Sequence, residues 1–274
     1  MVYMTRHLFI FGLGFCTGHL RRHLRDSNWS IAATRRKADA DAIAFDDRDA
    51  VEQALAQATH IISSVPPADG EDPVLANYAE AIARSQARWV GYLSSTGVYG
   101  DCGGAWVDEA APTGHGRRKD RAQADADWLA LDPQRVRCFR LPGIYGPGRS
   151  PIARARAGQI QCVDVPGQVF SRVHVDDIVG AVVASFEHGL PGAYNLTDDV
   201  PAPQAEVNAY ACKLIGHMPP PMIGLDDPSL SPAARAFYDE NRRVANGKAK
   251  RLLGWSPQYP DYRAGLQMLL QRGE

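Results

Sequence analysis

Four short segments of this sequence have residue types and spacings that suit chemistry on a small molecule. Gly12 and Gly14 stand one residue apart directly after an apolar run, an arrangement that lets backbone N–H groups approach a phosphate. Two basic runs begin at Arg35 and Arg117, and arginine side chains bind phosphate or carboxylate oxygens in pairs. A hydroxyl-rich run begins at Ser94, and a hydroxyl placed in this way can orient a reacting oxygen.

The glycine turn lies between a predicted strand at 7–11 and a predicted helix at 17–24. Gly12 permits a tight turn, Gly14 lets the backbone approach a pyrophosphate, and the helix N-terminus supplies N–H groups. The third position of the pattern is Thr17. Either Thr17 packs against the sheet where glycine or alanine is usual, or the turn is one residue longer and reaches Gly18. In this strand–helix context the turn favours a dinucleotide site over a plain loop.

The end of the second predicted strand indicates which dinucleotide would bind. It reads Thr34-Arg35-Arg36-Lys37, and arginine at this place accommodates the 2′-phosphate of NADP, whereas an acidic residue would favour NAD. The cations therefore favour NADP over NAD, although they also fit a solvated basic turn. Asp46, after the third predicted strand, fits either the adenine edge or a helix cap.

Strands and helices alternate through the first half of the chain. The predicted strands are 7–11, 29–34, 42–45, 60–65, 89–94 and 135–140, with 193–196 returning as a last strand. The predicted helices are 17–24, 50–57 capped by Asp47 or Asp49, 73–87, 121–131, and 177–188 capped by Asp176. This order predicts an α/β fold, a Rossmann-type doubly wound parallel sheet covered on both faces.

The proline-rich texture after Pro142 predicts a smaller, interleaved C-terminal substrate lobe. We expect a dinucleotide-binding domain at 1–146 and the lobe at 147–274, with about 174–197 returning to the main sheet. Residues 95–120 break the alternation and predict a long functional loop.

Five segments in a fixed order resemble the extended short-chain dehydrogenase/reductase superfamily, the NAD(P)-dependent epimerase/dehydratase group. They are Ser94-Ser-Thr-Gly-Val-Tyr99-Gly100, Arg140-Leu-Pro-Gly-Ile-Tyr145-Gly-Pro-Gly148-Arg149, His174-Val-Asp-Asp-Ile178, Tyr194-Asn-Leu196 and Leu253-Gly-Trp-Ser-Pro257. Together they span nearly the whole chain. The resemblance implies a nucleotide-binding sheet, a substrate lobe and an active site in the cleft between them.

The resemblance implies that Ser95 is the catalytic hydroxyl, which hydrogen-bonds the reacting oxygen. The family's Tyr-x-x-x-Lys pair, which exchanges a proton with substrate, is missing; Arg117 and Arg121 stand in its place. Arg121 retains a positive charge, but Arg117 cannot donate a proton because a guanidinium stays charged at accessible pH. The sequence therefore resembles an atypical branch of the family.

Four residues are candidate replacement acids, Tyr99, Tyr145, His115 and His174. The alternative is that the tyrosines shape the pocket and that His174 only starts a helix. The predicted catalytic residues are Ser95, Tyr145 and Arg121. The predicted cofactor-binding residues are Gly12, Leu13, Gly14, Thr17, Arg35, Arg36, Ser64, Val65, Pro66, Ser94, Pro142 and Gly143, and the predicted substrate-binding residues are Tyr99, Arg149, Ser171 and Arg172.

Composition excludes other classes of protein. Lys+Arg 30 against Asp+Glu 31 in 274 residues gives no long-range field for nucleic acid or a membrane surface. The five cysteines form no Cys-x-x-Cys pair, so neither a metal site nor a disulfide framework is expected. No apolar run approaches a membrane span and no export signal is visible, which predicts a cytoplasmic protein. The resemblance adds a homodimer as an expectation.

The residues favour an NAD(P)-dependent oxidoreductase or epimerase-like enzyme, with NADP as cofactor. It would transfer hydride to or from a carbonyl or secondary alcohol, and the resemblance offers nucleotide sugars as substrates. A non-catalytic NADP(H)-binding redox sensor or scaffold is the alternative, because the catalytic pair is replaced. A third interpretation, a plain α/β domain for another nucleotide, requires the glycine turn to have no dinucleotide role.

Overall fold

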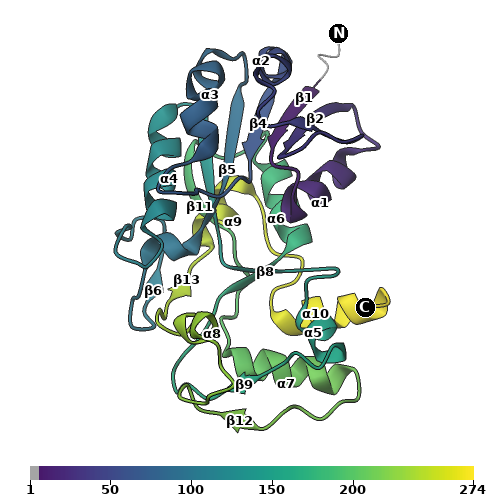
Figure 1. Cartoon of the computed structure of the whole chain (residues 1–274), viewed down its shortest axis with the longest axis vertical. Helices are drawn as coiled ribbons and strands as arrows, with labels where there is room; N and C mark the ends of the chain where they lie inside the picture. Colours follow the sequence, from purple (N-terminus) through teal and green to yellow (C-terminus); the bar gives the residue numbers. More distant parts are fainter. Residues whose placement is uncertain (1–5) are drawn as a thin grey trace.

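A seven-stranded sheet forms the centre of the molecule (Figure 1). The computed structural model describes residues 6–274. The strand order is β11-β7-β5-β4-β1-β2-β3, and every pairing is parallel. The strands are β1 (Arg6–Phe11), β2 (Trp29–Arg35), β3 (Ile43–Ala44), β4 (His60–Ser63), β5 (Trp89–Ser95), β7 (Val136–Leu141) and β11 (Gly192–Asn195). This arrangement confirms the predicted Rossmann-type fold.

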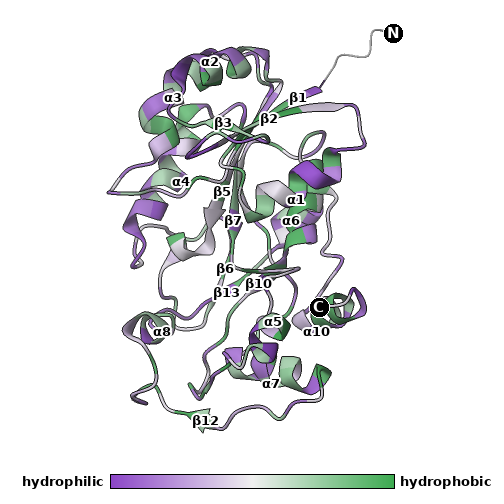
Figure 2. Ribbon diagram, turned by 45° about the vertical axis from the view of Figure 1, so that its right-hand side comes forward, coloured by the Kyte–Doolittle hydropathy of each residue, from purple (hydrophilic) through white to green (hydrophobic). Residues whose placement is uncertain are grey.

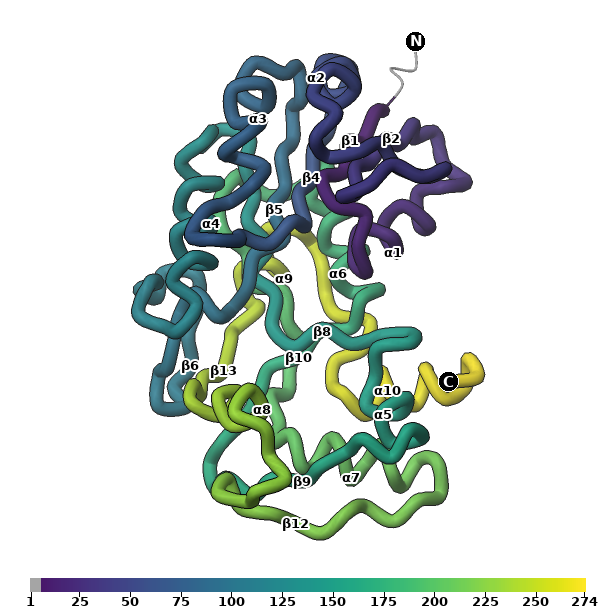
Figure 3. Tube along the Cα trace, in the orientation of Figure 1, coloured from purple at the N-terminus to yellow at the C-terminus, as the bar shows by residue number. Residues whose placement is uncertain are grey.

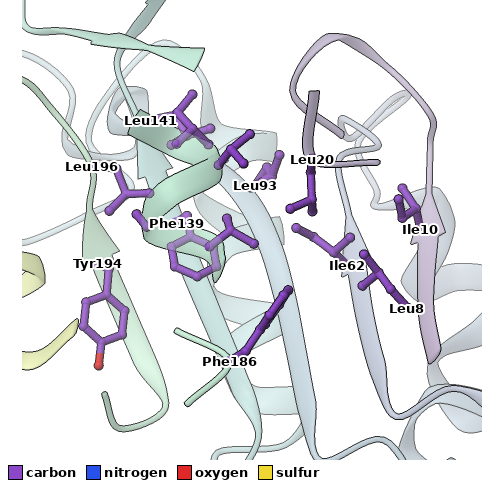
Figure 4. Packing of buried hydrophobic residues seen from close by; sticks show 14 of the residues in the cluster. Leu8, Ile10, Leu20, Ile62, Leu93, Phe139, Leu141, Phe186, Tyr194 and Leu196 are labelled. Atoms are coloured by element: carbon purple, nitrogen blue, oxygen red, sulfur yellow. The ribbon is translucent and has the colours of Figure 1, made fainter. Parts of the chain in front are cut away.

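Helices cover both faces of the sheet. One face carries α1 (Phe15–Leu24), α6 (Val175–Ala184) and α9 (Gly247–Leu253), and the other carries α2 (Arg48–Gln57), α3 (Pro73–Arg84) and α4 (Lys119–Leu131). Figure 4 shows the first of these layers, where side chains of β1, β4, β5, β7 and β11 meet Leu20 of α1 and Phe186 beyond the end of α6. Figure 2 shows hydrophilic and hydrophobic residues alternating along α2, α3 and α4, as expected of helices with one buried face.

The structure corrects the predicted cap of one helix and places a further helix on the main sheet. Helix α6 begins at Val175 and its cap is His174, whose Nδ1 accepts a hydrogen bond from the N–H of Asp176 (3.1 Å), so Asp176 is not the cap. Helix α9 follows the second-lobe segments in sequence, yet it packs on the main sheet through Ala249 and Leu253. The cap of α2 is Asp47, one of the two predicted residues, whose side chain accepts from the N–H of Ala50.

The second lobe has its own core. Its elements are β8 (Gly143–Tyr145), α5 (Pro151–Arg156), β9 (Cys162–Val163), β10 (Arg172–His174), α7 (Gln204–Leu214), β12 (Met222–Ile223), α8 (Pro232–Ala236) and α10 (Tyr262–Gln271). Helices α5, α7 and α10 bury Ile152, Val207 and Leu266 against one another. Figure 3 shows the chain crossing between this lobe and the sheet several times.

A short strand from the C-terminal part of the chain pairs with the predicted functional loop. This loop contains a 3-10 helix, η1 (Thr96–Tyr99), and a short strand, β6 (Trp106–Val107). Strand β13 (Arg243–Val244) pairs with β6, so the segment after α8 is held beside the loop after β5. Within residues 6–274 no helix combines the length and the apolar character needed to cross a membrane.

Candidate active site

The glycine turn lies where the strand order of the sheet reverses, between β2 on one side of β1 and β4 on the other. Gly12 has a φ of +81°, and a Cβ atom there would lie 2.9 Å from Cγ2 of Val65. The N–H of Leu13 donates to the carbonyl of Thr34 (2.9 Å). The turn is therefore tied to its neighbouring strand at the reversal point, where ligands bind in folds of this kind.

Thr17 fills the third position of the turn. Its side chain is fully buried, and its hydroxyl donates to the carbonyl of Gly12 (2.7 Å) and accepts from the N–H of Gly14 (2.9 Å). Ser64 Oγ also donates to the carbonyl of Gly12 (2.6 Å). Thr17 thus packs behind the turn, as the first of the two predicted alternatives states, and its hydroxyl supports the backbone of the turn. A Cβ on Gly18 would meet nothing within 4 Å.

A cavity of about 490 Å³, the site cavity, runs from this turn to the second lobe. It brings together most of the predicted site residues: Gly14, Ser64, Pro66, Ser94, Ser95, Arg121, Pro142, Gly143, Arg149, Ser171 and Arg172. They come from the ends of β1, β4, β5 and β7, from α4 and from β8 and β10. Parallel strands collect these distant segments because their carboxyl ends share one edge of the sheet.

Ser95 stands at the end of β5 as the cap of η1. Its Oγ accepts a hydrogen bond from the N–H of Gly97 (3.0 Å), which leaves the hydroxyl proton to be donated elsewhere. A Cβ on Gly97 would lie 3.2 Å from Oγ of Ser95 and 3.1 Å from Cδ of Arg118. The side chain of Arg118 therefore crosses Gly97 beside Ser95. The sequence predicts Arg117 and Arg121 at the position of the family pair, and it misses Arg118.

Arg117 is held by a buried carboxylate. Its backbone N–H donates to Oε1 of Glu240 (2.8 Å), while Nη1 of Arg242 donates to Oε2 (2.9 Å). Burial of Glu240 raises its pKa, but the hydrogen bonds from Arg117 and Arg242 outweigh this effect and lower the pKa overall. Glu240 therefore remains an anion. Neither Glu240 nor Arg242 could be placed from the sequence, because they lie more than a hundred residues beyond Ser95.

Arginine dominates the wall of the site cavity. Six arginines line it, Arg117, Arg118, Arg121, Arg149, Arg172 and Arg242. The only acidic residue that lines it, among the residues that the structure describes, is Glu240. Nη1 of Arg121 lies 3.3 Å from the hydroxyl of Tyr92, and the guanidinium of Arg149 lies 5.5 Å from the ring centroid of Phe15. The cavity is thus strongly positive in a chain of nearly balanced charge.

Tyr99, predicted to bind substrate, lies outside the cavity wall. Its hydroxyl donates to Oδ1 of Asn195 (2.7 Å) and accepts from Nη1 of Arg140 (3.0 Å). Arg140 in turn donates to Asp125 through two nitrogens, and Ser94 Oγ donates to the same carboxylate (2.5 Å). All five side chains are buried. Tyr99 and Ser94 therefore belong to a structural network beneath Ser95.

Tyr145, predicted as a catalytic residue, lies in a different cavity. A second-lobe cavity of about 850 Å³ adjoins the site cavity and is lined by Tyr145. The Tyr145 hydroxyl is buried without a hydrogen-bond partner in the described chain, and burial raises its pKa. A Cβ on Gly265 of α10 would collide with this hydroxyl at 2.0 Å. The tyrosine packs beneath α10 and does not line the cavity that contains Ser95.

The two histidines do not supply an acid beside Ser95 either. Burial lowers the pKa of His174 to about 4, so it is neutral and serves as the cap of α6, which was the predicted structural alternative. His115 is exposed and lines none of the cavities described here.

The predicted phosphate clamp is only partly assembled. A third cavity of about 400 Å³, the α1 cavity, is lined by Leu13 and Gly14 and by four arginines, Arg21, Arg22, Arg25 and Arg35. Arg35 pairs with Asp39, and Arg21 with Asp41 (2.8 Å). The sequence does not predict the arginines of α1 as cavity residues, because their spacing is that of the solvent-exposed face of a helix.

Other predicted cofactor residues lie outside this cavity. Arg36 is exposed and does not line the cavity. Val65 packs against Gly12. Asp46 is exposed and does not cap α2.

The comparisons with known proteins include a solved structure whose function is unknown. No family model matches the chain. A protein of unknown function from Silicibacter pomeroyi shares 41% identity and a TM-score of 0.87, over 98% of this chain and 100% of that chain. A human epimerase family protein, solved with NADPH, shares 16% identity and a TM-score of 0.77, over 97% of this chain and 99% of that chain.

A curated relative matches part of the chain. The sequence is 33% identical over 139 residues to a 3-diazoavenalumate denitrifying reductase from a Streptomyces species, which is 47% of this chain and 45% of that protein. The chain thus spans about half the length of this relative. Other solved structures with the fold contain NAD. The Tyr-x-x-x-Lys pair of the family that the sequence resembles is absent from the chain. The chain belongs to the family of the Silicibacter pomeroyi protein, and it has the fold of the epimerase and dehydratase proteins among these solved structures.

Proposed function

We propose that the protein is an NADP-dependent reductase that transfers hydride to an electrophilic group of a small molecule without a protein proton donor. One observation carries the proposal: a single cavity joins the glycine turn to Ser95 and Arg118. The solved relatives with NADPH or NAD and the reductase from Streptomyces support it.

The residues of the turn fit a dinucleotide. Gly14 has an ordinary extended backbone, and a Cβ there would meet only Ser64 Oγ, at 3.9 Å, so its backbone faces open space. Phe15 and Cys16 begin α1 and line the site cavity, and the first N–H groups of a helix have no partner within the helix. Arg149 adds a cation beside Phe15. These groups would hold the pyrophosphate, and a reduced nicotinamide bound beyond them supplies a hydride.

The α1 cavity supports NADP as the cofactor. It adjoins the turn through Leu13 and Gly14, and its four arginines outnumber the one carboxylate in its wall, Asp41. A 2′-phosphate seated there would gain charge-assisted hydrogen bonds that the 2′-hydroxyl of NAD cannot match.

Replacing Arg35 with glutamate is therefore expected to weaken NADPH binding by about 10- to 100-fold, the loss of one or two charged hydrogen bonds. NADH binding should change by less than about threefold. Tryptophan fluorescence titration measures both affinities, and Arg84→Glu on the exposed face of α3 is the control. Equal losses for the two cofactors would contradict the assignment.

The wall of the site cavity suits hydride transfer without acid catalysis. Ser95 can donate a hydrogen bond, the aliphatic part of the Arg118 side chain crosses Gly97 next to it, and Arg118 lines the same cavity. Glu240 is ionised, and burial raises the pKa of the Cys16 thiol to about 11. No histidine, aspartate or tyrosine lines the cavity within residues 6–274. These groups can stabilise negative charge on the acceptor, but none titrates near neutrality.

Acceptors of two kinds fit such a wall. Hydride transfer to a carbonyl would create an oxyanion that accepts a hydrogen bond from Ser95 in a positively charged cavity and is later protonated by water. A diazonium group would be replaced by hydride with release of N2, and that step consumes no proton. The name of the Streptomyces relative indicates chemistry of the second kind.

The test is NADPH oxidation by the purified chain with aldehydes, ketones and aryl diazonium salts. We expect turnover with at least one class, a kcat/KM that changes less than about threefold between pH 6 and 8, and a loss of about 10- to 100-fold in Ser95→Ala. A rate controlled by one ionisation near pH 7 would reveal a protein acid and overturn the proposal. Tight NADPH binding with no oxidation by any acceptor would favour the sensor alternative.

A further inference from the structure

We infer that four arginines of the site cavity, Arg117, Arg118, Arg121 and Arg242, bind a carboxylate or phosphate group of the substrate, so that the reductase acts on anions with an apolar body. We call these residues the arginine cluster. The inference rests on the proposed function and names its substrate class.

The arginine cluster is an excess of positive charge that the described chain does not neutralise. The four arginines share the cavity wall with one carboxylate, Glu240. Glu240 accepts hydrogen bonds from the backbone N–H of Arg117 and from Nη1 of Arg242, and its Oε1 lies 3.9 Å from Nε of Arg117. Neither Arg118 nor Arg121 has an ion pair with residues 6–274. Like charges gathered beside a cavity favour an anion inside it.

The cluster also gathers at an unfavourable place. Arg118 is the N-cap of α4 and its side chain makes no capping hydrogen bond. Lys119 and Arg121 follow in the first turn, where Asp120 is the acidic residue. Positive side chains at a helix N-terminus oppose the helix dipole. Burial and the neighbouring charges of Arg121 and Arg117 lower the pKa of Arg118. A bound anion would relieve both the repulsion and the unfavourable dipole interaction.

The cluster lies next to the reacting centre and away from the cofactor phosphates. Arg118 crosses Gly97 beside Ser95, and Nη1 of Arg242 donates to the carbonyl of Gly100 (2.6 Å), at the other end of η1. The glycine turn, where the pyrophosphate would bind, has its own cation in Arg149 beside Phe15. An anion on the arginine cluster would therefore belong to the substrate.

Another part of the cavity wall fits an apolar body. Phe170 and Phe237 stack at 4.5 Å between ring centroids with 17° between their planes, and both line the site cavity. Val169 and Val244 add apolar surface. A planar ring or conjugated chain would pack on this wall while its carboxylate or phosphate faced the arginines, since aromatic surfaces prefer such contacts.

The test measures binding to the chain loaded with NADP⁺, by calorimetry, for benzoate, phenyl phosphate, inorganic phosphate and the neutral benzamide. We expect benzoate or phenyl phosphate to bind at least about 10-fold more tightly than benzamide, as one charged hydrogen bond would give. Phenyl phosphate should also bind more tightly than inorganic phosphate, because its ring packs on the apolar part of the wall. If benzoate binds more tightly than phenyl phosphate, the substrate anion is a carboxylate; if phenyl phosphate binds more tightly, it is a phosphate.

Two variants test the arginines themselves, Arg118→Gln and Arg121→Gln. Each is expected to weaken binding of the anion by at least about 10-fold and binding of NADPH by less than about threefold. Arg156→Gln, which removes an exposed arginine of α5, is the matched control. Benzoate and phenyl phosphate that both bind no more tightly than benzamide, or variants that weaken NADPH binding as much as anion binding, would overturn the inference. Failure of the proposed function appears separately, as anion binding without NADPH binding or without turnover.

Discussion

Replacing Gly14 with valine is expected to weaken NADPH binding by about 100-fold or more while the fold remains intact. An effect of this size corresponds to the loss of two charged hydrogen bonds to phosphate. The backbone of Gly14, with φ of −102°, is accessible to any residue, and its ideal Cβ has only Ser64 Oγ within 4 Å. The valine methyl groups would instead enter the site cavity and cover the N–H groups at the start of α1. The folded variant should lose the cofactor, as fluorescence titration would measure.

Gly18→Ala is the matched control for this variant. It lies one helical turn along α1, a Cβ there meets nothing within 4 Å, and alanine favours helix. Gly12→Ala is not a clean test, because the φ of +81° and the 2.9 Å approach to Val65 would disturb the turn itself. A Gly14→Val protein that binds NADPH within threefold of the native protein would show that the turn holds no phosphate.

Arg140→Met is expected to lower the free energy of unfolding by about 3–5 kcal/mol, the usual cost of leaving one charge of a buried pair alone. The side chains of Arg140 and Asp125 are 5% and 2% exposed, and two nitrogens of Arg140 donate to the carboxylate. Methionine fills much the same volume but leaves Asp125 with only Ser94 as a donor among these partners. Urea unfolding followed by circular dichroism measures the loss.

A double-mutant cycle gives this prediction its control. Asp125→Leu combined with Arg140→Met removes both charges, so the double variant should recover most of the stability that the single variant loses. Additive losses in the cycle would show that the two side chains do not act as a pair. The pair matters for the site because Ser94, which it holds, directly precedes Ser95 in β5.

Local sequence patterns predicted the parts of the site that one strand and its following turn create. The turn at Gly12 and the end of β5 at Ser95 are such features, because an apolar strand followed by small or hydroxyl residues fixes which side chains reach the sheet edge. The parallel sheet covered on both faces followed from the alternation of strands and helices, because parallel strands need crossover connections.

Features that depend on distant packing could not be predicted. Whether Arg117 or Arg118 reaches Ser95 depends on where α4 begins, a boundary that sequence locates only within a few residues. Glu240 and Arg242 reach the site because β13 pairs with β6. Tyr145 resembled an accessible acid, but Gly265 lets α10 pack directly on its hydroxyl.

A crystal structure of the chain with NADPH tests the central claim most directly. The account predicts that the pyrophosphate lies on the N–H groups after Gly14, and that the nicotinamide opens toward Ser95 Oγ and the Arg118 guanidinium, with no histidine or tyrosine beside it. A nicotinamide bound elsewhere, or one that faces a histidine or tyrosine able to donate a proton, would contradict the account.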